Sequence, residues 1–210
     1  MTVPQNKIET EDYKVKSLTR WIMACAVLAL PLAANAQLNS NTTNVSLSAT
    51  LNESLSVTLN SGATQSITSL TPAAVNSFNG GPANVTTAWV LKPGRTAVAL
   101  YAYFDAPTGA MLHTDSSNTV DIPAAAIKAQ LNGAGAHNGL GNSLASTFGG
   151  TATGLQLFSQ SITGTNKNSS RTDTIALQLD LSGPANGQDM TQLPADTYTG
   201  TMHIRAQATP

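Results

Sequence analysis

The chain has one cysteine, few aromatic residues and few charges. Aromatic residues make up 5% of the 210 residues and charged residues 10%. The single cysteine, Cys25, lies inside an apolar run near the N-terminus, so the rest of the chain has neither a disulfide nor a thiolate metal site. A domain formed by that remainder therefore depends on its hydrophobic core alone.

Basic residues are scarce and scattered. Residues 37–210 contain six basic and eight acidic residues and have a net charge of −2 with neutral histidines. A phosphate-binding surface needs clustered lysine and arginine side chains, so the sequence excludes nucleic acid as a partner of the usual kind. The abundant threonine, serine, asparagine, alanine and glycine residues are typical of a β-rich extracellular domain.

The N-terminal region contains the three zones of a secretory signal. A basic stretch at residues 14–20 precedes an uncharged apolar run, Trp21–Leu32, and Ala34-Asn35-Ala36 follows as a small-x-small cleavage site. The apolar run is shorter than the roughly 20 residues that a membrane-spanning helix needs. We therefore expect a signal peptide over residues 1–36, cleaved near Ala36. The mature protein is then secreted to the periplasm, cell surface or exterior and does not span a membrane.

Alternation of apolar and polar residues predicts most of the strands. Residues 37–44 are polar and are expected to form a flexible lead-in. The expected strands are residues 45–51, 55–59, 85–91, 97–104, 155–162, 175–181 and 198–208, with another short strand near Ile67 and Leu70. Period-two alternation gives each strand one buried face, whereas residues 97–104 are apolar on both faces and indicate a central strand. Eight or nine strands and no convincing helix predict one antiparallel, Ig-like β-sandwich over residues 45–210.

Three connections are less regular. Strands 85–91 and 97–104 are expected to form a hairpin with Pro93-Gly94 at a type II turn. Residues 123–131 are compatible with a strand or a helix, and the following Asn132-Gly133 favours the strand because that dipeptide is a hairpin signal. Residues 133–154 are rich in glycine, asparagine, serine and alanine and are expected to form a long loop or an interrupted hairpin.

The C-terminal segment Leu193–Ile204 contains a proline, a short turn, Tyr198, one residue, Gly200 and then an alternating strand. This pattern resembles the closing motif of secreted bacterial β-sandwiches, namely spore-coat-U-type proteins, chaperone–usher pilin subunits and bacterial Ig-like modules. In such a motif the tyrosine packs where the chain enters its last strand, and its hydroxyl bonds a nearby loop backbone.

The resemblance to pilins also gives the N-terminal alternating segment a second interpretation. In pilins, the N-terminal strand of one subunit completes the sheet of its neighbour by β-augmentation. The simpler interpretation is that residues 45–59 form the first strand or two of a complete sandwich, and this is the one we expect. Alternation alone does not distinguish the two.

Candidate catalytic and metal-binding residues are few. The histidines are His113, His137 and His203; His113 lies near Asp115, and no G-x-S-x-G motif occurs. A calcium site would need the loops carrying Asp105, Asp115 and Asp121 to converge, together with carbonyls of Gly109 and Asn118. Glu53 is the one glutamate after the signal, which disfavours a carboxylate pair for glycoside cleavage. We expect no catalytic, cofactor-binding or metal-binding residue and no cofactor.

Exposed aromatic rings are what a glycan-binding module would need. Phe78 and Phe148 are expected in loops, and Trp89, Tyr101 and Tyr103 are expected in the core. The other aromatic candidates are Phe104, Phe158 and Tyr198. The sequence as a whole predicts a secreted, non-enzymatic structural or cell-surface protein, with assembly into fibres by strand addition as one form of that role. Its partners would be its own copies or another surface protein, bound through edge strands. The alternative is an extracellular module that binds a glycan or a small ligand.

Overall fold

The computed structural model describes residues 41–210, so the expected signal peptide and residues 37–40 of the lead-in lie outside the described residues. The chain divides into two units, Met1–Ala49 and Thr50–Pro210. Residues 41–53 contain no helix or strand. The strand predicted over residues 45–51 is therefore wrong, whereas the one predicted over residues 55–59 lies within strand β1 (Ser54–Ser61).

The first large sheet of the Thr50–Pro210 unit is antiparallel throughout. Its strand order is β1–β3–β10–β6–β7, and β2 pairs with the end of β10. The bounds are β2 (Val75–Ser77), β3 (Ala83–Val90), β6 (Ile127–Leu131), β7 (Asn138–Gly139) and β10 (Asn168–Asp180). The prediction for residues 175–181 recovered only the second half of β10, because the strand begins seven residues earlier.

The second sheet has the order β14–β4–β9–β8 and is also antiparallel. Its strands are β4 (Ala97–Phe104), β8 (Asn142–Ser143), β9 (Thr153–Ser161) and β14 (His203–Thr209). Two short ribbons complete the unit: β11 (Pro184–Ala185) with β12 (Gln188–Asp189), and β5 (Leu112–His113) with β13 (Tyr198–Thr199). Every strand pairing is antiparallel and strands far outnumber helices, which confirms the all-β class for the described residues. The short strand expected near Ile67 and Leu70 is absent from the described residues, where Ser66 makes a single bridge to Asn79.

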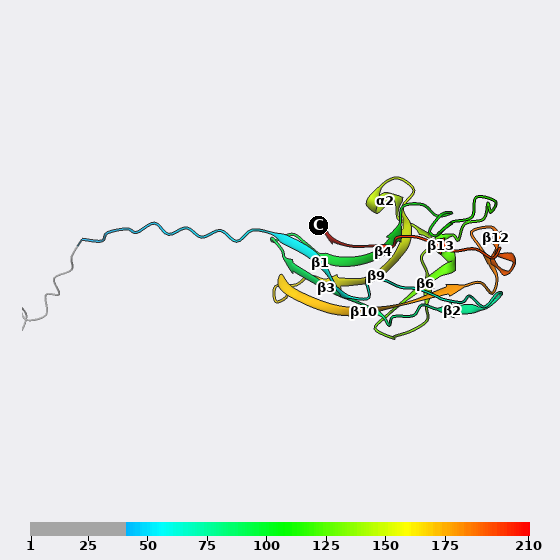
Figure 1. The fold of residues 1–210 in the computed structure, drawn as a ribbon. Helices are drawn as coiled ribbons and strands as arrows, with labels where there is room; N and C mark the ends of the chain where they lie inside the picture. The colour runs from blue at the N-terminus through cyan, green and yellow to red at the C-terminus, as the bar shows by residue number, and fades with distance from the viewer. Residues whose placement is uncertain (1–40) are drawn as a thin grey trace, which may run out of the picture. The chain divides into compact units, whose positions relative to one another are not determined.

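One hydrophobic core joins the two sheets. Alternate residues of β3 are buried, and Val98, Leu100, Ala102 and Phe104 of β4 belong to the same cluster. The intervening residues Ala99 and Tyr101 of β4 are buried as well, in a second cluster beneath helix α2 (Ala145–Phe148). This double burial explains the apolar character of residues 97–104 and confirms β4 as an inner strand. Figure 1 shows β4 and β9 running above β3 and β10.

The predicted hairpin between residues 85–91 and 97–104 is wrong. Gly94 has a positive φ of 99°, as a type II turn requires, but β3 and β4 enter different sheets. The turn therefore carries the chain across the core instead of returning it along the same sheet. Pairing partners depend on contacts distant in sequence, which a local turn signal does not encode.

The two regions left open by the sequence contain short elements. After Pro123 the alanine run forms one 3₁₀ turn, η1 (Ala124–Ala126), and β6 follows directly, so the strand interpretation is confirmed for residues 127–131. Asn132 and Gly133 both have positive φ, and β7 returns antiparallel to β6. Of the two alternatives for residues 133–154, the long loop is wrong, because they hold β7, β8, α2 and the start of β9. The interrupted hairpin agrees with the antiparallel pairing of β8 with β9 across α2.

A second 3₁₀ turn, η2 (Met190–Gln192), precedes β13. The strand predicted over residues 198–208 is interrupted at residues 200–202, which separate β13 from β14. In the described residues, 41–210, no helix is both long enough and apolar enough to cross a bilayer.

Candidate functional site

An unpaired, amphipathic segment lies directly before β1. Val45, Leu47 and Leu51 are 79%, 90% and 79% exposed, and the serines and threonine between them are exposed as well. Large aliphatic side chains at alternate positions give an extended segment one continuous apolar face. No strand of the described residues pairs with this segment, so that face is available to a partner.

The Thr50–Pro210 unit has unpaired strand edges on two flanks. Among the described residues, β1 pairs only with β3 and β14 only with β4, and these two edge strands are neighbours across the core; we call this the β1–β14 flank. The second half of β9 pairs only with β4, and the first half of β10 only with β3. Arg171 of β10 lies 3.9 Å from the ring centre of Phe158 of β9, which joins these two edges into the β9–β10 flank. Each flank carries backbone groups that can accept a further strand.

The β1–β14 flank is apolar except at the end where Arg95 and Glu53 form an ion pair. Leu55 and Val57 of β1 and Ile204, Ala206 and Ala208 of β14 are half-buried and pack on the core. Their partial exposure means that apolar surface reaches the edge of the unit. The flank therefore combines free backbone groups with uncovered apolar side chains.

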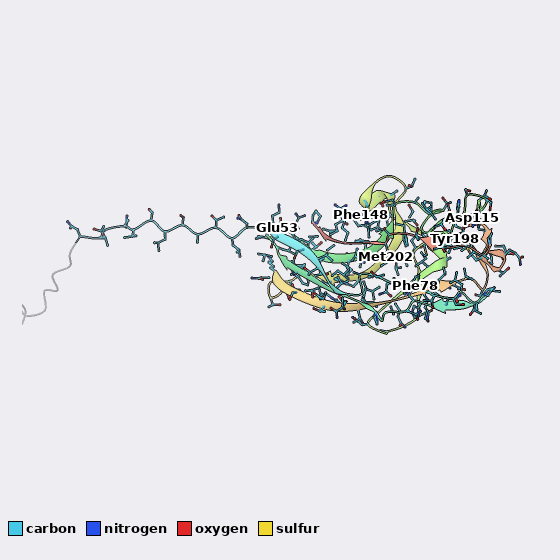
Figure 2. The ribbon with its side chains drawn as sticks, viewed as in Figure 1. Glu53, Phe78, Asp115, Phe148, Tyr198 and Met202 are labelled. Atoms are coloured by element: carbon cyan, nitrogen blue, oxygen red, sulfur yellow. The ribbon has the colours of Figure 1, made fainter. Side chains whose placement is uncertain are left out.

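One end of the β1–β14 flank is fixed by an ion pair. Arg95 Nε donates to Glu53 Oε1 at 2.8 Å, and Nη2 donates to Oε2 at 3.3 Å. The Arg95 guanidinium lowers the pKa of Glu53. Arg95 also donates to the carbonyl of Ala208 in β14, so the residue just before β1 is tied to the end of β14. Figure 2 labels Glu53 at the start of β1.

The β9–β10 flank is charged. Asp173 is 2% exposed and points into the core, where it accepts from Arg171 Nε at 2.7 Å, from Arg171 Nη2 at 2.5 Å and from Asn132 Nδ2 at 2.7 Å. Arg171 in turn covers the ring of Phe158. A bidentate arginine–carboxylate pair thus fills the space between β9 and β10.

The histidines form two isolated acid pairs. Asp121, rather than the expected Asp115, lies 2.7 Å from His113 Nδ1, and it also accepts from the His113 backbone N–H. His203 Nε2 lies 3.3 Å from Asp105, on the surface. No hydroxyl of the described residues hydrogen-bonds either imidazole, so the structure does not bring together the nucleophile, base and acid that hydrolysis needs. His137 is half-buried in the turn before β7.

The three candidate calcium ligands, Asp105, Asp115 and Asp121, each bind a different partner. Asp105 pairs with His203, Asp121 with His113, and Asp115 accepts from the backbone and hydroxyl of Ser117, which lowers its pKa. Within residues 41–210 no group of three histidine, cysteine or acidic side chains is placed to hold a metal ion.

Several of the aromatic candidates form a cluster beside α2. Phe148 stacks on Tyr103 at a centroid distance of 4.7 Å and meets Tyr101 edge-on at 5.2 Å, while Arg205 lies 5.0 Å from the Phe148 ring. His203 covers Tyr103 at 5.2 Å. These rings hold residues 144–152 against the outer face of the second sheet, and a shallow depression of about 310 Å³ opens beside them. Trp89 is a core residue, as expected, and Phe104 and Phe158 are buried in the same core.

A larger cleft of about 630 Å³ lies beside the C-terminal turn. Its walls include Ile67, Phe78, Met111, Leu193 and Tyr198, and Asp196 lies at its rim. Asn118 and neighbouring backbone N–H groups hold the pKa of Asp196 well below its usual range. The cleft is thus lined by apolar and polar side chains together, and the Asp196 carboxylate adds a negative charge.

Tyr198 forms the corner that the C-terminal motif predicts. The ring is buried, its hydroxyl donates to the carbonyl of Pro194 at 2.9 Å, and it accepts from Asn118 Nδ2 at 3.0 Å. Burial raises the pKa of Tyr198. Figure 2 shows Tyr198 at the same end of the unit as Asp115. The Asp196 carboxylate accepts a hydrogen bond from the backbone N–H of Asp115.

We expect the Tyr198→Phe substitution to lower the free energy of unfolding by about 1–2 kcal/mol, because it removes both the donor to the Pro194 carbonyl and one of the two acceptors of Asn118 Nδ2. Urea denaturation followed by tryptophan fluorescence would measure the change. Tyr103→Phe is the matched control, since it deletes the same atom from an aromatic residue outside this corner. An equal loss in both variants would show that the corner hydrogen bonds have no special role.

Comparison of the chain with known proteins found no matching family model, no matching curated protein and no matching solved structure.

Proposed function

We propose that the chain is a secreted, non-enzymatic structural or cell-surface protein that assembles by strand addition. In this proposal Thr50–Pro210 is an Ig-like β-sandwich, and residues 45–51 supply a strand to another molecule. The observation that carries the proposal is the exposure of Val45, Leu47 and Leu51 on a segment that pairs with no strand of the described residues. The proposal is also supported by the unpaired, partly apolar edges of the two sheets, which are able to accept such a strand.

Burial of the segment would provide a large driving force. Covering a valine or leucine side chain stabilises by about 1.5–3 kcal/mol, and three such residues act together here. Part of this gain offsets the entropy lost on association. Main-chain hydrogen bonds to an edge strand then add directionality, as in other examples of β-augmentation.

The tightest turn before β1 would pair the segment with its own β1 in an unfavourable register. A two-residue turn at Asn52-Glu53 would place Leu51 opposite Ser54, and Ala49 opposite Ser56. Directly opposed residues in an antiparallel pair share a face. Since Ser54 and Ser56 are on the exposed face of β1, such a hairpin would turn the apolar side chains of the segment towards water. A separate molecule is free to bind in the register that buries them.

The test is a substitution that removes the apolar face but keeps the segment. We expect the triple variant Val45→Ser, Leu47→Ser and Leu51→Ser to remain monomeric at concentrations where the unsubstituted chain associates, because it has lost the buried surface. Size-exclusion chromatography with light scattering would measure the mass. The matched control is Ser46→Thr with Ser48→Thr, which changes the polar face and should assemble normally.

Two results would contradict the proposal. The unsubstituted chain would be monomeric at all concentrations, or the triple variant would associate as well as the control. Urea denaturation of both variants provides a check on the domain, whose stability should be unaffected because the substituted side chains are exposed.

A glycan- or small-ligand-binding module is the second candidate. The aromatic cluster of Tyr103 and Phe148, flanked by Arg205, supplies rings and a polar group of the kind that bind sugars. A binding module would be monomeric, and its ligand affinity would depend on Phe148 and not on Leu47. The triple variant therefore separates the two functions.

A further inference from the structure

We infer that the acceptor of residues 45–51 is the outer edge of β14 in a second copy of this chain. The inference rests on the proposed strand addition and specifies its partner and its acceptor edge. Four edges are long enough to compete for the segment: β1 and β14 on one flank, and the unpaired parts of β9 and β10 on the other. The edge strands β7 and β8 have only two residues each. Their side chains distinguish them.

The β9–β10 flank is unsuited to an uncharged, aliphatic strand. The space between its edges is occupied by Arg171 and Asp173, which are bonded to each other and covered by Phe158. A donor strand would place Leu47 or Leu51 against this ion pair or displace it. Separating a buried ion pair from its partner groups costs several kcal/mol, so the apolar segment gains less here than on an apolar flank.

Within the β1–β14 flank, β14 offers the longer apolar stripe. Ile204, Ala206 and Ala208 are all half-buried, so partly covered apolar surface runs the length of the strand. In β1 only Leu55 and Val57 are half-buried, and the strand is exposed from Thr58 onwards. A segment with apolar residues over seven positions therefore matches β14, which itself has seven residues.

Side-chain size adds to the match. Ala206 and Ala208 lie opposite the buried Leu100 and Val98 of β4, and their small side chains leave the edge of the core thinly covered. The valine and leucines of the donor would supply the missing volume, since interfaces pack large residues against small ones. A strand added to β14 would also continue the second sheet opposite Leu55 and Val57, which lie on the same flank.

Cysteine cross-linking tests the acceptor directly. Donor chains carry Ser46→Cys, Ser48→Cys or Thr50→Cys, three positions that together cover the alternative registers. Acceptor chains carry one cysteine on an outward-facing position of each edge, namely Gln207→Cys in β14, Ser56→Cys in β1, Ser170→Cys in β10 or Ser159→Cys in β9. All chains also carry Cys25→Ser. Because each chain has one engineered thiol, every donor–acceptor disulfide must join two molecules.

We expect at least one donor to form roughly tenfold more covalent dimer with Gln207→Cys than with any other acceptor, because only paired strands bring the two Cβ atoms within disulfide range. Preferred cross-linking to Ser56→Cys, Ser170→Cys or Ser159→Cys, with assembly intact, would overturn the assignment of β14 but leave strand addition standing. Assembly with no cross-link to Gln207→Cys from any donor would also overturn it. Failure of the unsubstituted chain to assemble would instead refute the proposed function.

Discussion

Replacing Asp173 with alanine is expected to lower the free energy of unfolding by about 3 kcal/mol. The carboxylate is almost fully buried and accepts three hydrogen bonds, two from Arg171 and one from Asn132. Without it, the Arg171 guanidinium faces the core beside Phe158 with no counter-ion. Breaking a buried pair in this way typically costs about 3–5 kcal/mol, and the lower end applies because the Arg171 side chain is 30% exposed and keeps access to water.

A double-mutant cycle separates the pair from the packing around it. The cycle consists of Arg171→Leu, Asp173→Leu and their combination, and we expect the double variant to be more stable than Asp173→Leu alone, because no unpaired charge remains. Urea denaturation would measure each step. Asp105→Ala serves as the control, because the Asp105 side chain is 82% exposed. A loss below about 1 kcal/mol for Asp173→Ala would mean that the ion pair is dispensable, as a surface pair is.

This ion pair also explains why half of β10 could not be predicted. Strand signals depend on apolar residues at alternate positions, but the inward positions of the first half of β10 are Ser169, Arg171 and Asp173. A strand that is polar on both faces has the same local pattern as a loop. The second half, with Ile175, Leu177 and Leu179, was predicted correctly because its inward face is apolar.

The prediction for the N-terminal segment is wrong in the opposite way, because a strand was expected over residues 45–51 and none is present. Val45, Leu47 and Leu51 alternate as regularly as Leu55 and Val57, yet only the latter pair are in a strand. Alternation reports that a face can be buried and does not say by what. The sequence therefore indicated the candidate donor segment and the Tyr198 corner. The unpaired edges of β1 and β14 could not be predicted, because they depend on the strand order. The same limit applies to His113, whose acid partner is Asp121, eight residues away and brought near by folding.

The glycine of the C-terminal motif is expected to be as critical as its tyrosine. Gly200 follows β13 where that strand lies against β5, and a Cβ on Gly200 would overlap the carbonyl oxygen of Ala110. The carbonyl oxygen belongs to the backbone, so the overlap is relieved only if the two backbone segments separate. That separation would disturb the β5–β13 pairing and the Tyr198 corner beside it. Forcing extra atoms into a packed site costs about 1–3 kcal/mol.

We therefore expect Gly200→Ala to lower the free energy of unfolding by about 2–3 kcal/mol, near the top of that range because no flexible side chain can yield. Gly183→Ala is the matched control, since a Cβ there meets no atom within 4 Å and its φ is not positive. Urea denaturation would compare the two variants, and the fluorescence of the core Trp89 would report whether the remaining domain stays folded. If Gly200→Ala were as stable as Gly183→Ala, close backbone approach would not be the reason for a glycine two residues after the tyrosine. The motif would then depend on Tyr198 and its hydrogen bonds alone.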